Sequence, residues 1–258
     1  ITSSASTNLI TTNTMSGITY DDKGRMLGYM STNNEMSKPD SGASLNVFTT
    51  TARSQIDYDP ATGQMLKYLD TTYSTATGGA YDALTNMVSG GAQEVKSMQG
   101  IIYDLQNRMT DYTESTRIKY HESDPSNKDL LYTTTIRNDI TYDAATGQMT
   151  GYKDTIYSTA TGGKMALVAW GTCTDGVKET RVMSVIKYDD KGRMFSYTEN
   201  DTQYYIEGAT VKLNVTTTTV RTNIVYDDTV NKLGQMTGYK DTITSSASTN
   251  LITTNTMS

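Results

Sequence analysis

The side chains that could take part in chemistry are few and lie far apart in the sequence. His121 is the only histidine and Cys173 the only cysteine among 258 residues. A metal site or a catalytic triad normally combines a histidine with further ligands or with a nucleophile. Cys173 lies between two threonines, with no basic neighbour to favour the reactive thiolate. We therefore predict no catalytic residue, no cofactor and no enzymatic activity.

Pairs of adjacent aspartates are the groups best suited to a cation. They occur at 21–22, 189–190 and 227–228. Carboxylates bind Ca²⁺, but this spacing does not match the ligand spacing of an EF-hand loop. An aspartate can also cap a tight turn by accepting hydrogen bonds from the backbone just ahead of it. The turn interpretation needs no ion, so we predict no metal site.

The aspartates belong to a stretch of about nine residues that occurs six times. It reads ITYDDKGRM from Ile18, and related stretches begin near residues 56, 101, 140, 186 and 224. The Ile and the Tyr two residues later share one face of a strand, the Asp opens a turn, and the Gly closes it in a left-handed conformation. Each copy therefore predicts the tip of a β-hairpin. Asn107 replaces the glycine in the third copy.

We assign turn or packing roles to one set of residues from these copies. They are Tyr20, Asp21, Gly24, Ile56, Tyr58, Asp59, Gly63, Tyr103, Asp104, Ile140, Tyr142, Asp143, Gly147, Tyr188, Asp189, Gly192, Tyr226, Asp227 and Gly234. The first, third and fifth tips end in Arg-Met, whereas the other three end in Gln-Met. This alternation suggests that adjacent hairpins meet through two different interfaces.

The strand that enters each tip alternates between two kinds of residue. Counting back by twos from Ile56 gives Ser54, Ala52 and Thr50, whereas Arg53 and Thr51 fall on the other face. The same pattern precedes Ile140 and Ile224. Period-two alternation is typical of a sheet with one packed and one hydrated face. We predict that the arginine face is the hydrated one.

Composition favours strands and a thin core. Threonine is the commonest residue, and the aromatic residues are 19 Tyr, 2 Phe and 1 Trp. The net charge of −6 disfavours nucleic acid as a partner, and no apolar run approaches the ~20 residues of a membrane helix. We predict an all-β fold of tandem antiparallel hairpins, an extended or spiral sheet, as a single array over residues 1–258 without an internal boundary.

Two glycine-flanked insertions interrupt the hairpins. Residues 75–92 and 159–176 contain Met, Leu and Trp among small residues. Such an insertion can form a short lid over the sheet, or a contact surface for another repeat or subunit.

Residues 243–258 repeat residues 1–16 without a change. Three origins remain open: a natural tandem array with a 242-residue period, a segment slightly longer than one period, or an engineered strand duplication that satisfies an open edge. In the first case we expect the array to continue beyond residues 1 and 258.

The threonine-rich strands allow three interpretations. The simplest is β propensity combined with solubility. Asn200 and Asn214 each match the acceptor pattern for N-glycans, and the Thr and Ser runs would suit O-glycans. A flat threonine array could also bind ice, but Arg53, Arg137 and Arg221 interrupt it at matched positions.

The tips resemble those of the YD-repeat, or Rhs-type, family. The resemblance rests on Tyr20-Asp21-x-x-Gly24-Arg25-Met26 and its counterpart at 188–194, with weaker matches at the other four Tyr-Asp pairs. It covers about eight residues in each repeat, and the spacing here is longer than in the family. It implies long spiral β-sheets on large secreted or surface proteins, some of which enclose a toxin.

These observations lead to an expected function. The chain is expected to be a structural repeat segment of a giant extracellular or cell-surface filament or adhesin from a bacterium. Its partners would be copies of itself or adjacent repeats, joined by continuation of the sheet, together with glycans. The alternative is a Rhs-like shell or a carbohydrate-binding adhesin module.

Overall fold

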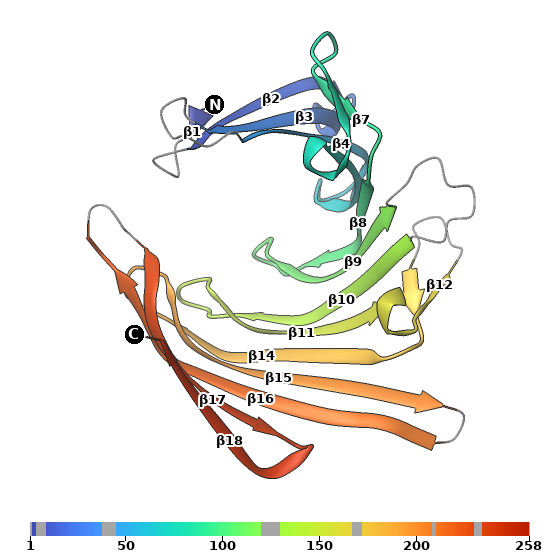
Figure 1. Cartoon of the computed structure of the whole chain (residues 1–258). Coiled ribbons are helices and arrows are strands. Elements are labelled where there is room, and N and C mark those ends of the chain that lie inside the picture. Colours follow the sequence, from blue (N-terminus) through green and yellow to red (C-terminus); the bar gives the residue numbers. More distant parts are fainter. Residues whose placement is uncertain are drawn as a thin grey trace. The chain divides into compact units, whose positions relative to one another are not determined.

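The computed structural model describes residues 2–3, 9–37, 45–119, 130–166, 172–207, 210–229 and 234–257. They form a large antiparallel sheet whose strands follow one another in chain order, which confirms the predicted all-β array of hairpins (Figure 1). The described part contains no α-helix and only two short 3-10 segments, Thr75–Thr77 and Thr159–Thr161.

The sheet order omits only two small hairpins. It runs through β1 (Thr2–Ser3), β2 (Leu9–Tyr20), β3 (Met26–Ser37), β4 (Asn46–Tyr58), β5 (Met65–Ser74), β8 (Gln93–Tyr103), β9 (Met109–Lys119), β10 (Leu130–Tyr142), β11 (Met149–Ser158), β14 (Lys178–Tyr188), β15 (Met194–Glu207), β16 (Thr210–Asp227), β17 (Gln235–Ser245) and β18 (Ser248–Met257). The small hairpins pair β6 (Ala80–Asp82) with β7 (Met87–Ser89), and β12 (Lys164–Ala166) with β13 (Thr172–Thr174).

Packing divides the chain into two compact units. The first comprises Ile1–Ile101, Glu114–Thr133 and Leu167–Thr172; the second comprises Ile102–Thr113, Thr134–Ala166 and Cys173–Ser258.

The hairpin tips have the backbone geometry that a glycine-closed turn requires. Gly24, Gly63, Gly147, Gly192 and Gly234 all have positive φ, between 73° and 80°, and Asn107 has φ 62°. In the second tip the N–H of Gly63 donates to the carbonyl oxygen of Asp59 at 2.9 Å. The left-handed region is open to glycine at no steric cost and tolerates asparagine better than most residues.

A β-bulge just before the Ile of each tip corrects the predicted assignment of faces. The preceding residue is left-handed in all six copies, with φ between 52° and 62°. These residues are Gly17, Gln55, Gly100, Asp139, Val185 and Asn223. In β4 the register passes from Ser54↔Leu69 to Asp57↔Lys67, so two residues of β4 lie opposite one of β5.

The bulge moves the tip residues to the other face. Leu69 and Lys67 are two apart and share a face, so Ser54 and Asp57 share it too. Ile56 therefore lies on the face of Arg53, and not on the face of Ser54, Ala52 and Thr50 as predicted. The arginine face consequently carries buried isoleucines, and its prediction as the hydrated face was wrong.

The insertion at 75–92 forms a lid over part of one sheet face in the first unit. Its β6–β7 hairpin buries Val88, which is 1% exposed. The Val88 N–H donates to Thr50 Oγ1 at 2.8 Å, and Thr32 Oγ1 donates to the carbonyl oxygen of Asn86 at 2.7 Å. Tyr81 stacks on Phe48 with ring centroids 3.7 Å apart. These contacts bury the hydroxyls of Thr32 and Thr50 with hydrogen-bond partners.

The hydrophobic core is thin, as the composition predicts. Buried apolar side chains among the described residues are Ile56, Tyr68, Val88, Ile101, Tyr132, Ile140 and Ile186. The four buried isoleucines directly follow the bulge residues of the second to fifth copies of the motif. Stability therefore depends on cross-strand pairs to an unusual degree.

Candidate functional site

The aspartate of each tip is used to fix its own turn. Asp59 Oδ1 accepts from the N–H groups of Ala61 and Thr62 at 2.8 and 2.7 Å. Asp143 Oδ1 accepts equivalent bonds from Ala145 and Thr146. The backbone N–H of Thr62 above all, and then that of Ala61, lowers the pKa of Asp59 below its ordinary value. The carboxylates at these tips therefore stabilise turns.

In the arginine-ending tips the aspartate also binds the arginine four residues later. Arg25 Nε lies 2.7 Å from Asp21 Oδ2, and the same pair recurs between Arg108 and Asp104 and between Arg193 and Asp189. This pair orients the guanidinium along the tip, where it reaches the next hairpin.

Each of these arginines stacks on the tyrosine of the next motif. The guanidinium carbon of Arg25 lies 4.7 Å from the ring centroid of Tyr58. The corresponding distances are 4.4 Å for Arg108 on Tyr142 and 4.5 Å for Arg193 on Tyr226. These separations lie within the range of cation–π attraction. The alternation between Arg and Gln tips therefore decides which tips make this contact. Arginine tips add a stacked contact to the following hairpin.

The motif tyrosine donates a hydrogen bond to the main chain of the preceding hairpin. We call this contact the tyrosine latch, defined by the bonds Tyr58–Met26, Tyr142–Met109, Tyr188–Met149 and Tyr226–Met194. In each pair the hydroxyl donates to the Met carbonyl oxygen, at 2.6 to 2.7 Å. Burial raises the pKa of Tyr188 above its ordinary value. The latch joins hairpins that are neighbours in sequence.

The other two motif tyrosines differ in their surroundings. Tyr20, in the first copy, is 57% exposed. Tyr103 ends β8, and burial raises the pKa of its hydroxyl.

A second repeated contact lies further along the strands, on the arginine face. We call it the Arg–Asp clamp, defined by the pairs Arg53–Asp70, Arg137–Asp154 and Arg221–Asp241. In each, Nε and Nη2 of the arginine donate to the two carboxylate oxygens of the aspartate, at 2.6 to 2.7 Å. This two-pronged geometry is the strongest form of the ion pair.

Two tyrosines enclose every clamp. The Arg137 guanidinium carbon lies 3.8 Å from the ring centroid of Tyr152 and 5.7 Å from that of Tyr112. Arg53 and Arg221 lie between two tyrosines at almost the same distances. Asp154 and Asp241 are only 3% and 5% exposed. Hydrogen bonding to Asp154 above all raises the pKa of Arg137, which favours the charged guanidinium.

The sequence reasoning missed the aspartates of the clamp. The matched arginines at 53, 137 and 221 were visible, but their partners at 70, 154 and 241 were not assigned. A signal existed, because each partner stands two residues after the tyrosine that begins Tyr-Leu-Asp or Tyr-Lys-Asp in the return strand.

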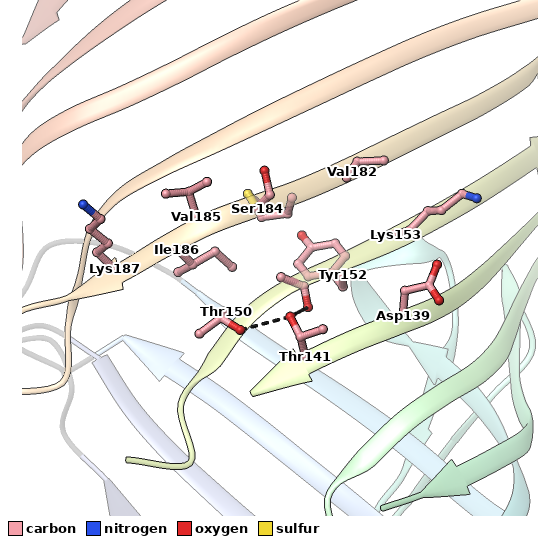
Figure 2. A pocket seen from close by; sticks show the side chains of 12 residues that line it. Asp139, Thr141, Thr150, Tyr152, Lys153, Val182, Ser184, Val185, Ile186 and Lys187 are labelled. Carbon is pink, nitrogen blue, oxygen red and sulfur yellow. Dashed lines mark hydrogen bonds between the residues drawn. The ribbon is translucent and has the colours of Figure 1, made fainter. Parts of the chain in front are cut away.

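An open groove of about 550 Å³ lies in the second unit, between β10–β11 and β14 (Figure 2). Asp139 and Lys153 lie toward one end of it and Lys187 toward the other. Along its floor Thr150 Oγ1 donates to Thr141 Oγ1 at 3.0 Å. A Cβ on Gly151 would come within 2.9 Å of the Met183 carbonyl oxygen, so glycine permits the close approach of the strands here.

The two candidate glycosylation sites differ in their surroundings. Asn214 is exposed on β16, whereas Asn200 Oδ1 accepts a hydrogen bond from Thr218 Oγ1 at 2.7 Å. A glycan is therefore accommodated more readily at Asn214. His121 lies outside the described residues.

In the part of the chain that the structure describes, no cluster of three His, Cys, Asp or Glu side chains could hold a metal ion. A search of the same residues found no helix with the length and hydrophobicity to cross a membrane. Comparison with protein-family models, with curated proteins and with solved structures found no match.

Proposed function

We propose that this chain is a structural repeat segment of an extracellular or cell-surface filament or adhesin, in which the sheet is extended by further hairpins of the same kind. One observation carries the proposal. The side chains that recur in the motif bind their own turn or the neighbouring hairpin, through the tyrosine latch and the stacked tip arginines. The motif residues therefore stabilise each hairpin and its contact with the next hairpin.

The edge of the sheet at β18 supports the same function. Unpaired N–H and C=O groups at a sheet edge favour pairing with another strand unless the edge is protected. The described residues Thr253–Thr256 of β18 are exposed, and they include no charged residue or proline that would oppose pairing. The resemblance to YD-repeat proteins is consistent with a surface location and a repetitive β-structure.

Electron microscopy of the purified chain, combined with sedimentation over a range of concentrations, tests this function. Six hairpins supply twelve strands, and strands are about 4.8 Å apart, so a 242-residue period rises by at most about 58 Å along the fibre. We expect filaments whose axial period equals that rise or, if the sheet coils, a smaller one. Particles of one or two chains at every concentration would contradict the proposal.

The groove in the second unit favours one alternative, a carbohydrate-binding adhesin module. Asp139, Lys153 and the hydroxyls of Thr141 and Thr150 offer donors and acceptors to a sugar. Glycan-array screening of the full chain beside a Lys153→Ala variant distinguishes this alternative: loss of a specific signal in the variant would favour it. A shell that encloses cargo, as in Rhs-type proteins, would appear as hollow particles in the same micrographs.

A further inference from the structure

The last strand that the structure describes, β18, repeats part of the sequence of β2. Residues 251–257 of β18 are identical to residues 9–15 of β2. The two strands have different surroundings. β2 pairs with β3 from Leu9↔Ser37 to Tyr20↔Met26, whereas β18 pairs with β17 and, within the described part of the chain, with no other strand.

The β2–β3 pair defines what such a sequence binds. Asn13 lies opposite Asn33, Thr11 opposite Glu35 and Met15 opposite Ser31. Ser31 Oγ donates to Asn13 Oδ1 at 2.8 Å, so the side chains also take part. Adding 242 to each β2 number gives Thr253, Asn255 and Met257 of β18, which carry the same side chains in the same order.

We propose that β18 of one chain takes the place of β2 against β3 of a second copy of this chain. This strand exchange rests on the proposed self-assembly and specifies its junction. The register would be Asn255 opposite Asn33, Thr253 opposite Glu35 and Met257 opposite Ser31 of the second copy. The β3 strand of the second copy would therefore bind in β18 the same sequence that it binds in its own β2.

The exchange has a low cost because most of the replaced contacts are the same. The β2–β3 pairs of residues 9–15 that are lost within the second copy are regained with residues 251–257 of β18, whereas Thr19↔Gly28 and Tyr20↔Met26 have no counterpart in β18. Exchange of an identical element is a low-cost route to association. The other edge of β2 is held by β1 through the described pairs Thr2↔Thr12 and Ser3↔Thr11, a short contact to break.

A lateral alternative would keep β2 in place. In that case the edge of β18 would pair with the outer edge of β2 of the second copy, and β3 would not be involved. The two junctions differ in whether β2 must leave β3, which a covalent lock can test.

The test uses the full chain with Cys173→Ser as background and a disulfide that locks β2 onto β3. The lock is Asn13→Cys with Asn33→Cys, which are directly opposite. The matched control is Thr51→Cys with Thr72→Cys, which joins β4 to β5, where the two hydroxyl oxygens lie 3.0 Å apart. Both variants are studied oxidised and reduced, by sedimentation and electron microscopy.

We expect the oxidised lock to remain monomeric and to assemble on reduction, whereas the control assembles in both states. Assembly of the oxidised lock would overturn strand exchange and leave the proposed filament function intact. Failure of all variants and of the unmodified chain to assemble would overturn both.

A cross-link between copies gives a second, positive readout. Chains carrying Asn255→Cys are mixed with chains carrying Asn33→Cys, and the control replaces Thr254 instead of Asn255, which turns the thiol to the other face. We expect disulfide-linked pairs at least several-fold more abundant with Asn255→Cys. Equal yields from the two mixtures would contradict the register.

Discussion

The hydroxyl of Tyr58 donates a 2.7 Å hydrogen bond to the carbonyl oxygen of Met26, 32 residues earlier in the chain. Tyr58 closes the entering strand of the second hairpin, and Met26 opens the return strand of the first. The two ends of the repeated motif therefore bind each other across neighbouring copies. This relationship explains why the tyrosine recurs in the motif, whereas its main-chain acceptor places no demand on the residue type at Met26.

Removal of one latch hydroxyl should weaken one hairpin junction. We expect Tyr58→Phe to lower the free energy of unfolding by about 1 kcal/mol, because the Met26 carbonyl oxygen loses its donor. Tyr20→Phe is the matched control, since Tyr20 is largely exposed, and it should change stability little. Urea denaturation followed by circular dichroism measures both, and equal losses in the two variants would argue against the latch.

The Arg–Asp clamp should be sensitive to loss of one partner. Arg137→Ala leaves the almost fully buried Asp154 without its cation, and we expect a loss of about 3 kcal/mol in the free energy of unfolding. The control is Lys67→Ala, which removes a more exposed pair with Asp57, 3.6 Å apart, and should cost less than about 1 kcal/mol. Similar urea midpoints for the two variants would show that burial does not distinguish the pairs.

Stability should fall in acid through the turn aspartates. Hydrogen bonds from the backbone of Thr62 and Thr146 lower the pKa of Asp59 and Asp143 in the folded chain. Their contribution is fully present above the unfolded-state pKa of about 3.9 and is lost as the pH falls through the lower folded values.

The double variant Asp59→Asn/Asp143→Asn keeps the acceptors and removes the titration. We expect its stability to fall less steeply between about pH 5 and pH 2 than that of the unmodified chain. Urea midpoints across this range measure the slopes. Parallel curves would mean that these two carboxyls do not account for the acid sensitivity.

The bulge residue can be tested by reciprocal substitutions. Val185 has φ 52° and is 61% exposed, so Val185→Gly should stabilise the chain by up to about 1 kcal/mol through relief of backbone strain. Gly100 has φ 62° with no atom within 4 Å of a Cβ placed there, so Gly100→Val should destabilise by on the order of 1–2 kcal/mol. Melting temperatures that move in the same direction would refute the shared bulge geometry.

The hairpins were predictable because turn chemistry is local. Asp59, Pro60 and Gly63 specify a turn without reference to the rest of the chain. The faces of the strands were not predictable from the alternation alone, because one left-handed residue reverses it. Gly17, Gly100 and Asn223 gave a hint of that conformation, but Gln55 and Val185 are residue types that rarely adopt it.

The tyrosine latch and the Arg–Asp clamp were harder to derive. The latch ends on a main-chain oxygen, which has no residue type to detect in a sequence. The clamp joins residues 17 to 20 apart, whose pairing depends on the register across a turn and a bulge. The recurrence of Arg and Asp at matched places was visible, whereas the register that brings them together was not.

The pairing of each strand with its neighbours in sequence has a mechanical consequence. The strands β14 to β18 pair in chain order. Force applied to one end of the chain therefore loads the hydrogen bonds of the outermost strand a few at a time. Such a sheet opens like a zipper, hairpin by hairpin. Each hairpin of 38 to 46 residues then releases roughly 130–160 Å of chain. A tether built from these repeats would lengthen under load and absorb energy step by step before it broke.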